Sequence, residues 1–355
     1  MSFRKFKTRQ ICADLETTVG TFKLASSANP IWPCRGASTI KPGPEEEISN
    51  DDALDGYAGS IAATRGAVGM TGQIDCEIRD YTGSLVYPPW VRMLHASGMG
   101  STHAGSTVTM TPSTKAIADW PGESAGTRSP ATLSLAEVLL DNNTADELVK
   151  LRGASLASKL ILNTSGLALV SGVPHGLVVG SEVLDPDDVD LSDYGTRTSG
   201  EAVDPLVVKG ATLAVNYVDD SGPTDISAAV KRKWRQFEID IAPTIALEED
   251  PTATEGYSPG QPFHEGGHPV TLSFADTSTI AEDIMAGFYS KRGFLDIVLT
   301  LEMSTCTMVV DVPFVQYKAD REAADGGRIF SIQGVARRQN AGDSTAPLTV
   351  SHTYA

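Results

Sequence analysis

An alternating run of apolar and polar residues constrains the fold of this chain more than any other feature. Between residues 68 and 78, Val68, Met70, Ile74, Cys76 and Ile78 are separated by small or polar side chains. Successive side chains of a strand point to opposite faces, so this pattern predicts a strand with one buried and one polar face. The polar set includes Asp75 and Glu77, which we expect on the open face.

Many other segments carry strand patterns, and Gly, Pro, Asn or Asp separates most of them. They are residues 107–111, 131–140, 147–162, 166–173, 206–218, 236–247, 295–301, 308–314, 328–337 and 346–350. The 33 Gly and 20 Pro residues, with only 6% aromatic residues, are typical of a turn-rich β protein. We therefore expect a mainly β fold, an antiparallel sandwich or barrel with long loops.

One helix is predicted over residues 279–292. Thr279 and Glu282 have the spacing of a capping box, and Ile280, Ile284 and Phe288 recur along one face. Gly293 follows as a stop. This helix should lie with its apolar stripe on the sheet formed by the strands that follow.

A second, shorter helical segment is predicted within residues 87–98, which read Tyr-Pro-Pro-Trp-Val-Arg-Met-Leu-His-Ala-Ser-Gly. Pro88 and Pro89 block strand pairing and favour a helix start. Trp90, Met93 and Leu94 share one helical face, and Gly98 supplies the stop. One or two turns of helix should therefore pin a corner of the sheet.

Residues 36–59 have no apolar period and contain many helix and strand breakers. They predict a long loop. Loops of this length are uncommon inside a compact domain and are usually functional or disordered. A loop ordered only by assembly and a loop without any role both fit the pattern.

The formal net charge of −17 disfavours a protein that grips nucleic acid, because such proteins neutralise phosphates with clustered Lys and Arg. The charge suits a surface that DNA passes without sticking, and it equally suits an ordinary acidic protein. Residues 231–235 form the one compact basic cluster of the sequence. Trp234 there could stack on a base, although such clusters are more often charged strand edges.

The chain resembles the tail tube proteins of long-tailed bacteriophages. Residues 15–21, Leu-Glu-Thr-Thr-Val-Gly-Thr, are similar to the Glu-x-Thr-x-Gly-Thr segment with which those proteins often open. Residues 88–98 are similar to their Pro-Pro-Trp-x-x-x-Leu-x-Ala-x-Gly element. The resemblance covers residues 11–98 best and 279–350 in outline. It implies one tail tube domain over 1–355, with an inserted or decorating β subdomain within 105–260.

The resemblance implies a structural virion protein that forms stacked, hexameric rings as a conduit for DNA during ejection, with no catalytic residue. The loop 36–59 would bridge successive rings, through Lys41, Glu45, Glu46, Glu47, Asp51, Asp52 and Asp55. Asp75 and Glu77 are the candidates for the lumen wall. Six copies at −17 each would give about −100 per ring before screening.

The partners that the resemblance implies are further copies of the chain and the tail terminator, tape measure and tail tip proteins. Double-stranded DNA would pass without specific binding. The sequence has no segment of membrane-spanning length and its polar start is not a signal peptide. We expect no membrane partner and no cofactor, with assembly in the host cytoplasm and a final place in the virion.

Two other functions fit parts of the sequence. Residues 264–268, His-Glu-Gly-Gly-His, spell the zincin signature, in which two His on a helix bind zinc and the Glu polarises water. Pro262, the two glycines and Pro269 disfavour that helix, so we interpret the segment as a spacer between strands. A virion decoration or adhesin subunit would have a similar β composition.

Residues 182–204 are strongly acidic, but they lack the Gly and Glu positions of an EF-hand loop. We interpret them as an exposed, solvated insertion and assign no metal. The four cysteines are far apart in sequence, without a Cys-x-x-Cys pair. This spacing disfavours both a zinc knuckle and a disulfide framework, so we expect reduced thiols, with Cys76 in the core.

Overall fold

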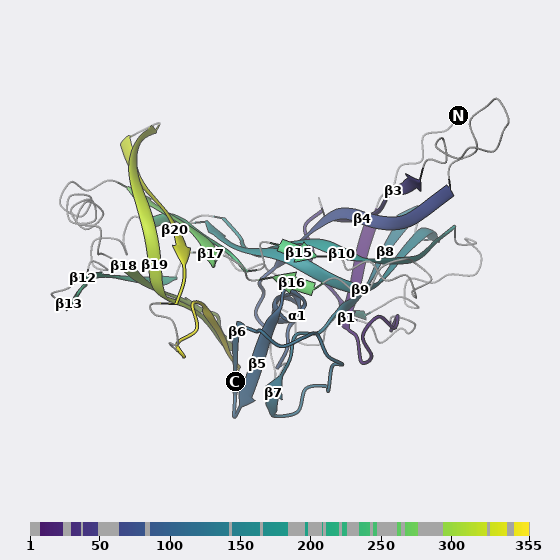
Figure 1. Cartoon of the computed structure of the whole chain (residues 1–355), viewed down its shortest axis with the longest axis horizontal. Helices are drawn as coiled ribbons and strands as arrows, with labels where there is room; N and C mark the ends of the chain where they lie inside the picture. The colour runs from purple at the N-terminus through teal and green to yellow at the C-terminus, as the bar shows by residue number, and fades with distance from the viewer. Residues whose placement is uncertain are drawn as a thin grey trace, which may run out of the picture.

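The computed structural model describes about two thirds of the chain as an extended assembly of strands (Figure 1). The described residues are 8–23, 30–36, 38–48, 64–81, 86–141, 144–163, 166–183, 196–197, 208, 211–219, 222–225, 234–241, 244–246, 261–263, 267–275, 294–324, 327–338 and 344–354.

The prediction of a mainly β fold is confirmed, and each of the predicted strand segments overlaps an observed strand. The strands are β1 Thr8–Leu15, β2 Pro30–Ile31, β3 Thr39–Ile48, β4 Thr64–Glu77, β5 Met99–Ala104, β6 Thr107–Pro112, β7 Gly126–Arg128, β8 Leu133–Asp141, β9 Thr144–Asn163, β10 Ala168–Val183, β11 Thr196–Arg197, β12 Thr212–Asp219, β13 Gly222–Asp225, β14 Trp234–Asp240, β15 Thr244–Ala246, β16 Gln261–Phe263, β17 His268–Ala275, β18 Phe294–Glu302, β19 Cys306–Ala324, β20 Gly327–Ala336 and β21 Thr349–Tyr354. The helix of the described residues is α1, Pro89–Ala96.

Hydrogen bonds join 19 of these strands into one sheet, in which the pairs are antiparallel except for β2 with β11. Strand β9 holds the centre, because it pairs with β10 along one side and with β8 and then β14 along the other. From β8 the sheet continues to β1, and from β10 to β4 and β3. From β14 it continues through β17, β20, β19 and β18 to β12. These two halves lie on the right and left of Figure 1.

The described strands in the middle of the chain pair with strands from both of its ends. Within residues 105–260, β6 pairs with β21, β8 with β1, β10 with β4 and β12 with β18. Among the described strands of this range, only β15 forms its pairing outside the large sheet, with β16. The inserted or decorating subdomain stays a prediction, but its described strands share ladders with both ends of the chain.

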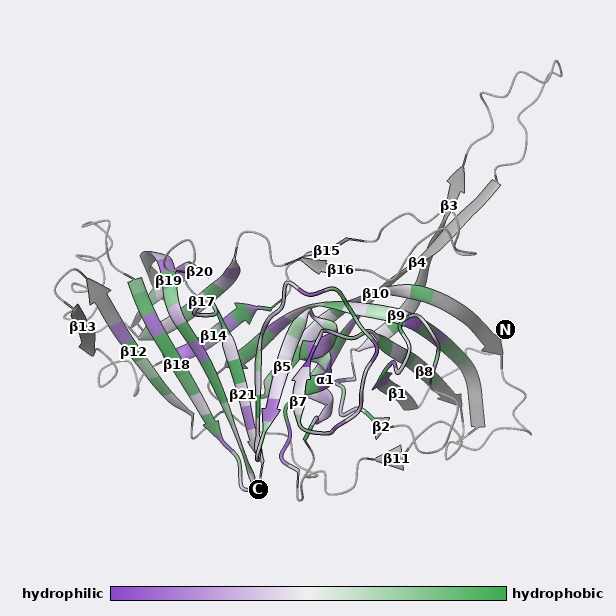
Figure 2. Ribbon diagram, turned by 60° about the horizontal axis from the view of Figure 1, so that its bottom comes forward, coloured by the Kyte–Doolittle hydropathy of each residue, from purple (hydrophilic) through white to green (hydrophobic). Residues whose placement is uncertain are grey.

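Side-chain alternation builds the core of the left half. Leu295, Ile297, Leu299 and Leu301 of β18 are buried and the residues between them are partly exposed, an alternation that Figure 2 shows along β18 and β19. Met308, Val310 and Val312 on β19 continue the alternation. Phe314 departs from the series because the register shifts between Leu295 and Ile297, which makes Val315 the next buried residue. A β-bulge of this kind moves every later side chain to the opposite face.

The helix predicted within residues 87–98 is confirmed. Pro88 precedes it in extended conformation, and Gly98 ends it with a φ of 84°. Trp90, Met93 and Leu94 are fully buried, and all residues of α1 except Arg92 are buried, so the helix is enclosed by the fold on all sides. The described helix therefore stands in the N-terminal third, and the helix predicted over 279–292 lies outside the described residues.

The loop predicted over residues 36–59 is wrong for its first half. Residues 39–48 form β3, which pairs antiparallel with β4 from Thr39 opposite Gln73 to Ile48 opposite Thr64. The breakers that indicated a loop, residues 42–44, coincide with the first of two register shifts, which lies between Pro42 and Glu45, and a second shift follows between Glu45 and Glu47. Pro and irregular pairing are tolerated on a strand that has a neighbour on one side, and the sequence pattern misses such a strand. Residues 49–59 and most of the acidic segment 182–204 lie outside the described residues.

An aromatic cluster surrounds the end of α1. The rings of Tyr87, His95 and Trp120 meet edge to face at centroid distances of 4.9 to 5.6 Å. The Arg128 guanidinium lies over Tyr87 and Trp120, 5.1 and 5.5 Å from the ring centroids. Burial, reinforced by the positive charges of Arg128 and Arg92, lowers the pKa of His95 from 6.5 to about 3. The cluster therefore holds His95 as a neutral ring.

This burial predicts that the protein loses stability in acid through His95. The unfolded chain takes up a proton as pH falls below about 6.5, whereas the folded chain does so only near pH 3. The contribution of His95 is complete above pH 6.5 and falls by up to about 1.4 kcal/mol per pH unit between these values. Gln does not titrate, so lowering the pH should destabilise the wild type more than a His95→Gln variant. In urea titrations the difference between their unfolding free energies should therefore be smaller at pH 4.5 than at pH 7. A difference that is the same at both values would contradict the assignment.

Candidate functional site

A buried carboxylate anchors the segment that resembles the opening of tail tube proteins. Glu16 is fully buried and directly follows β1. Its Oε2 accepts hydrogen bonds from the Gly20 amide and the Thr132 hydroxyl, each at 2.6 Å. Its Oε1 accepts them from the Ser134 hydroxyl at 2.9 Å and the Gly153 amide at 2.8 Å. One side chain thus holds its own turn and the strands β8 and β9 together.

The two glycines of this anchor have backbone conformations that disfavour other residues. Gly20 has a φ of 72° and Gly153 a φ of 59°, in the left-handed region where a Cβ is strained. In this conformation each amide points at the Glu16 carboxylate. The Glu and the Gly of the Glu-x-Thr-x-Gly-Thr pattern, Glu16 and Gly20, therefore share one structural role.

A chain of ion pairs joins the same segment to α1. Arg92 on the helix pairs with Asp14 on β1, and its Nε donates to the Tyr87 carbonyl at 2.8 Å. Lys23 Nζ also pairs with Asp14, at 2.5 Å, and Arg92 Nη2 reaches Glu123 at 2.7 Å. Arg92 and Asp14 are each less than one-sixth exposed. A partly buried polar contact therefore joins α1 to the residue directly before the 15–21 segment, although the two lie more than 70 residues apart.

The acidic residues predicted on the open face of β4 have different environments. Asp75 is partly exposed and accepts hydrogen bonds from Ser171 Oγ at 2.6 Å and Gln73 Nε2 at 2.8 Å. Glu77 is only 5% exposed, so its expected exposure is wrong. Its carboxylate pairs with Arg79 at 2.7 Å and with Arg35 at 3.3 Å. These pairs cover Glu77 and offset its charge, which leaves Asp75 as the acidic group on that face.

Some of the candidate residues for ring stacking lie on a strand, and the others lie outside the described residues. Lys41, Glu45, Glu46 and Glu47 lie on β3. Asp51, Asp52 and Asp55 lie outside the described residues.

A second buried carboxylate fixes the start of this strand. Glu137 on β8 is 1% exposed, and its Oε2 accepts hydrogen bonds from the Ile40 amide at 2.6 Å and the Thr39 hydroxyl at 3.3 Å. The base of the β3–β4 hairpin is therefore tied to the body of the sheet. No sequence pattern indicated this role, because Glu137 lies 97 residues from Ile40.

The second histidine of the zincin-like segment lies in a strand and not in a helix. His268 begins β17, is 1% exposed and pairs with Ala336, with Gly267 before it at a φ of 91°. Its Nδ1 lies 3.1 Å from the Asp240 carbonyl. His264 and Glu265 lie outside the described residues. Over the described part of the chain, no group of three or more His, Cys, Asp or Glu could hold a metal ion.

The basic cluster does not offer an open aromatic platform. Trp234 is 6% exposed at the start of β14, where it pairs with Phe274. Arg235 beside it is exposed, and residues 231–233 lie outside the described residues. A buried indole cannot stack on a base. Strand β14 also has a neighbour on each side, β9 and β17, so it is not an edge strand of the sheet.

We predict that Glu16→Gln destabilises the fold by about 3 kcal/mol. The amide group of Gln would face hydrogen-bond donors on either side, leaving buried donors without an acceptor. Urea unfolding of this variant should be compared with Glu123→Gln, whose side chain is 39% exposed and should change stability by less than about 0.5 kcal/mol. Equal effects of the two substitutions would show that the Glu16 carboxylate is not an anchor.

Among the described helices, none is long and apolar enough to cross a membrane. No family model matches the chain, and no curated protein matches its sequence.

Proposed function

We propose that this chain is a structural virion protein, the subunit of a phage tail tube, which forms rings that stack into a conduit for DNA. The observation that carries the proposal is the contact of α1, within residues 88–98, with the residue that precedes the 15–21 segment: Arg92 pairs with Asp14, close to the buried Glu16 anchor. Such a contact fixes the position of α1 relative to the N-terminal segment. It gives a structural reason for the Glu-x-Thr-x-Gly-Thr and Pro-Pro-Trp patterns to occur together in one subunit. The remaining partners would be the tail terminator, tape measure and tail tip proteins.

Strands that end the sheet support assembly by copies of the chain. In the described ladders, β3 pairs only with β4 and β13 only with β12. Val173 on β10 is 39% exposed, just beyond the four residues at which β10 pairs with β4. Edge strands with unpaired backbone groups favour pairing with another chain, and ring closure would satisfy them.

The β3–β4 hairpin is the proposed contact between successive rings. Strands β3 and β4 lie at the end of the right half of the sheet in Figure 1, and Glu137 fixes the base of the hairpin. A hairpin with a fixed base can present its far end in a defined direction, so it suits docking better than a free loop would.

The charge of the chain supports passage of DNA rather than its capture. A net charge of −17 per copy repels phosphate. In this proposal Asp75 on β4 belongs to the lumen wall, whereas Glu77 contributes little because Arg79 and Arg35 pair with it.

Electron microscopy of the concentrated, purified protein tests the function. Tubes of stacked rings are expected, because the edge strands and the hairpin would both be satisfied by assembly. A decoration or adhesin subunit would give discrete particles under all conditions and would contradict the proposal. Stoichiometric zinc in the purified protein, lost in a His264→Ala/His268→Ala variant, would instead support the hydrolase.

A shortened hairpin tests the stacking contact. Residues 49–63 connect Ile48 and Thr64, which are paired in register, so an Asn-Gly turn can replace them. The variant should keep the wild-type unfolding midpoint and fail to elongate into tubes.

The matched control replaces the same fifteen residues, 49–63, with Gly and Ser at unchanged length. This control shows whether tube formation requires only the length of the connection or also its side chains. Normal tubes from the Asn-Gly variant would remove the hairpin from the stacking contact while leaving the tube proposal in place.

A further inference from the structure

Three of the four cysteines gather where β1, β2 and β4 meet, although they are far apart in sequence. Cys12 lies on β1 opposite Ile31 of β2, and Cys34 follows β2 by three residues. Cys34 forms an isolated antiparallel bridge with Cys76 near the end of β4. All of them are thiols.

The bridge places Cys34 and Cys76 directly opposite each other. The Arg35 amide donates to the Asp75 carbonyl at 2.9 Å, and the Glu77 amide donates to the Pro33 carbonyl at 2.8 Å. Hydrogen bonds on both sides of the pair, and not within it, identify a non-hydrogen-bonded position of an antiparallel ladder. Cα atoms at such positions are about 4.5 Å apart and their side chains share one face. This separation lies within the range that a disulfide spans.

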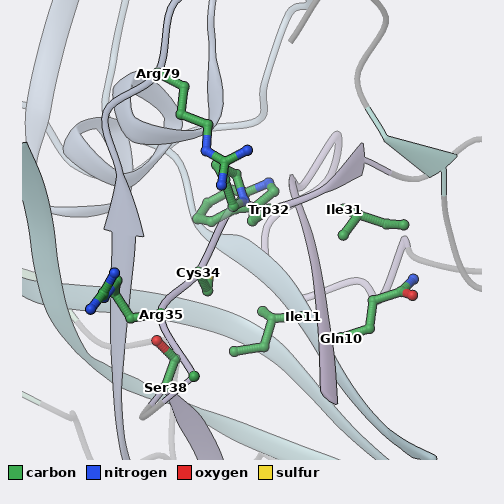
Figure 3. Close-up of a pocket in the computed structure, with 10 residues that line it drawn as sticks. Gln10, Ile11, Ile31, Trp32, Cys34, Arg35, Ser38 and Arg79 are labelled. Atoms are coloured by element: carbon green, nitrogen blue, oxygen red, sulfur yellow. The ribbon is translucent and has the colours of Figure 1, made fainter. Parts of the chain in front are cut away.

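A small cavity gives access to one member of the pair. Cys34 lines a cavity of about 200 Å³ together with Ile11, Trp32, Ser38, Arg35 and Arg79 (Figure 3). Cys34 is partly exposed, whereas Cys76 is fully buried in the core. A small oxidant would therefore meet Cys34 first, and Cys76 would be the thiol behind it.

The other two cysteines are less suited to react. Burial raises the pKa of Cys12 to about 11, and its sulfur accepts a hydrogen bond from Gln10 Nε2 at 3.2 Å. Cys306 lies on β19 with its sulfur 3.8 Å from the Tyr81 carbonyl, and burial raises its pKa as well. Thiolates are the reactive form, so both cysteines should remain thiols under mild oxidation.

We propose that Cys34 and Cys76 form a peroxide-oxidisable thiol pair that closes to a disulfide across the ladder. In the first step hydrogen peroxide oxidises the Cys34 thiol to a sulfenic acid and is reduced to water. In the second step the Cys76 sulfur attacks the Cys34 sulfur, the S–O bond breaks, and a second water leaves with the Cys76 proton. Two thiols lose two hydrogen atoms in total, and one peroxide gives two waters.

The bond would fasten the base of the β3–β4 hairpin, because Cys34 precedes β3 and Cys76 lies at the end of β4. The closed loop would contain the whole of β3. Restricting such a loop in the unfolded chain stabilises the folded one. The inference rests on the ladder geometry and does not depend on the proposed tail function.

Peptide mapping of the oxidised full-length protein tests the pair directly. Trypsin places each cysteine in a separate peptide, 10–23 for Cys12, 24–35 for Cys34, 66–79 for Cys76 and 293–318 for Cys306. After mild peroxide treatment and alkylation without reductant, peptides 24–35 and 66–79 should be joined, with a mass two hydrogens below their sum. The join should vanish with dithiothreitol. A join of 24–35 to 10–23, or Cys34 and Cys76 both alkylated, would overturn the proposal.

Two matched substitutions separate the roles of the neighbouring thiols. Cys12→Ala should leave the join between 24–35 and 66–79 unchanged. Cys76→Ala should abolish it and leave a sulfenic acid on Cys34 that dimedone traps. Retention of an intramolecular bond at Cys34 in Cys76→Ala would identify Cys12 as the true partner and refute the pair.

Thermal unfolding of the wild type gives a readout that needs no variant. Oxidised protein should unfold at a temperature higher by on the order of 5 °C than reduced protein, and dithiothreitol should reverse the shift. A shift in the opposite direction would show that the ladder cannot accept the bond without strain.

Discussion

The buried carboxylate of Glu16 is the interaction on which the N-terminal half of the structure depends. Removing a charged group from water costs several kcal/mol unless hydrogen bonds replace its hydration. Here four donors, from Gly20, Thr132, Ser134 and Gly153, provide them. The donors come from three separate segments, so β1, β8 and β9 must be assembled together for the charge to be satisfied. A misplaced register at any of the three would leave it buried without partners.

Other polar side chains also join separate segments of the chain. Asp14 with Arg92 joins β1 to α1, and Glu137 joins β8 to β3. Glu77 with Arg79 and Arg35 joins the end of β4 to the segment after β2. Hydrophobic burial stabilises the sheet without fixing unique neighbours, whereas each of these contacts requires one particular partner. Together they fix where the helix and the β3–β4 hairpin stand on the sheet.

The cysteine pair belongs to the same region, and its geometry has the same origin. Cys34 and Cys76 face each other because the backbone hydrogen bonds around Pro33 and Arg35 continue the ladder of β4 beyond β3. The Glu77 contacts with Arg35 and Arg79 hold both strands of that ladder. A covalent bond there would add to an existing set of contacts at the hairpin base, not create a new one.

The sequence by itself determined the mainly β class, the buried faces of β18 and β19, and the short helix ended by Gly98, because each follows from side-chain periodicity or local backbone preference. It misplaced β3, whose Pro and Gly residues are tolerated on an edge strand. It also placed Glu77 in the open, because alternation alone does not show which polar group finds two arginines. The tertiary structure alone decided the partners of Glu16, Asp14, Glu137 and Cys34. Apart from the contact of Glu16 with Gly20 four residues on, those contacts join residues from 42 to more than 130 positions apart, and no local pattern in a single sequence encodes a contact across such distances.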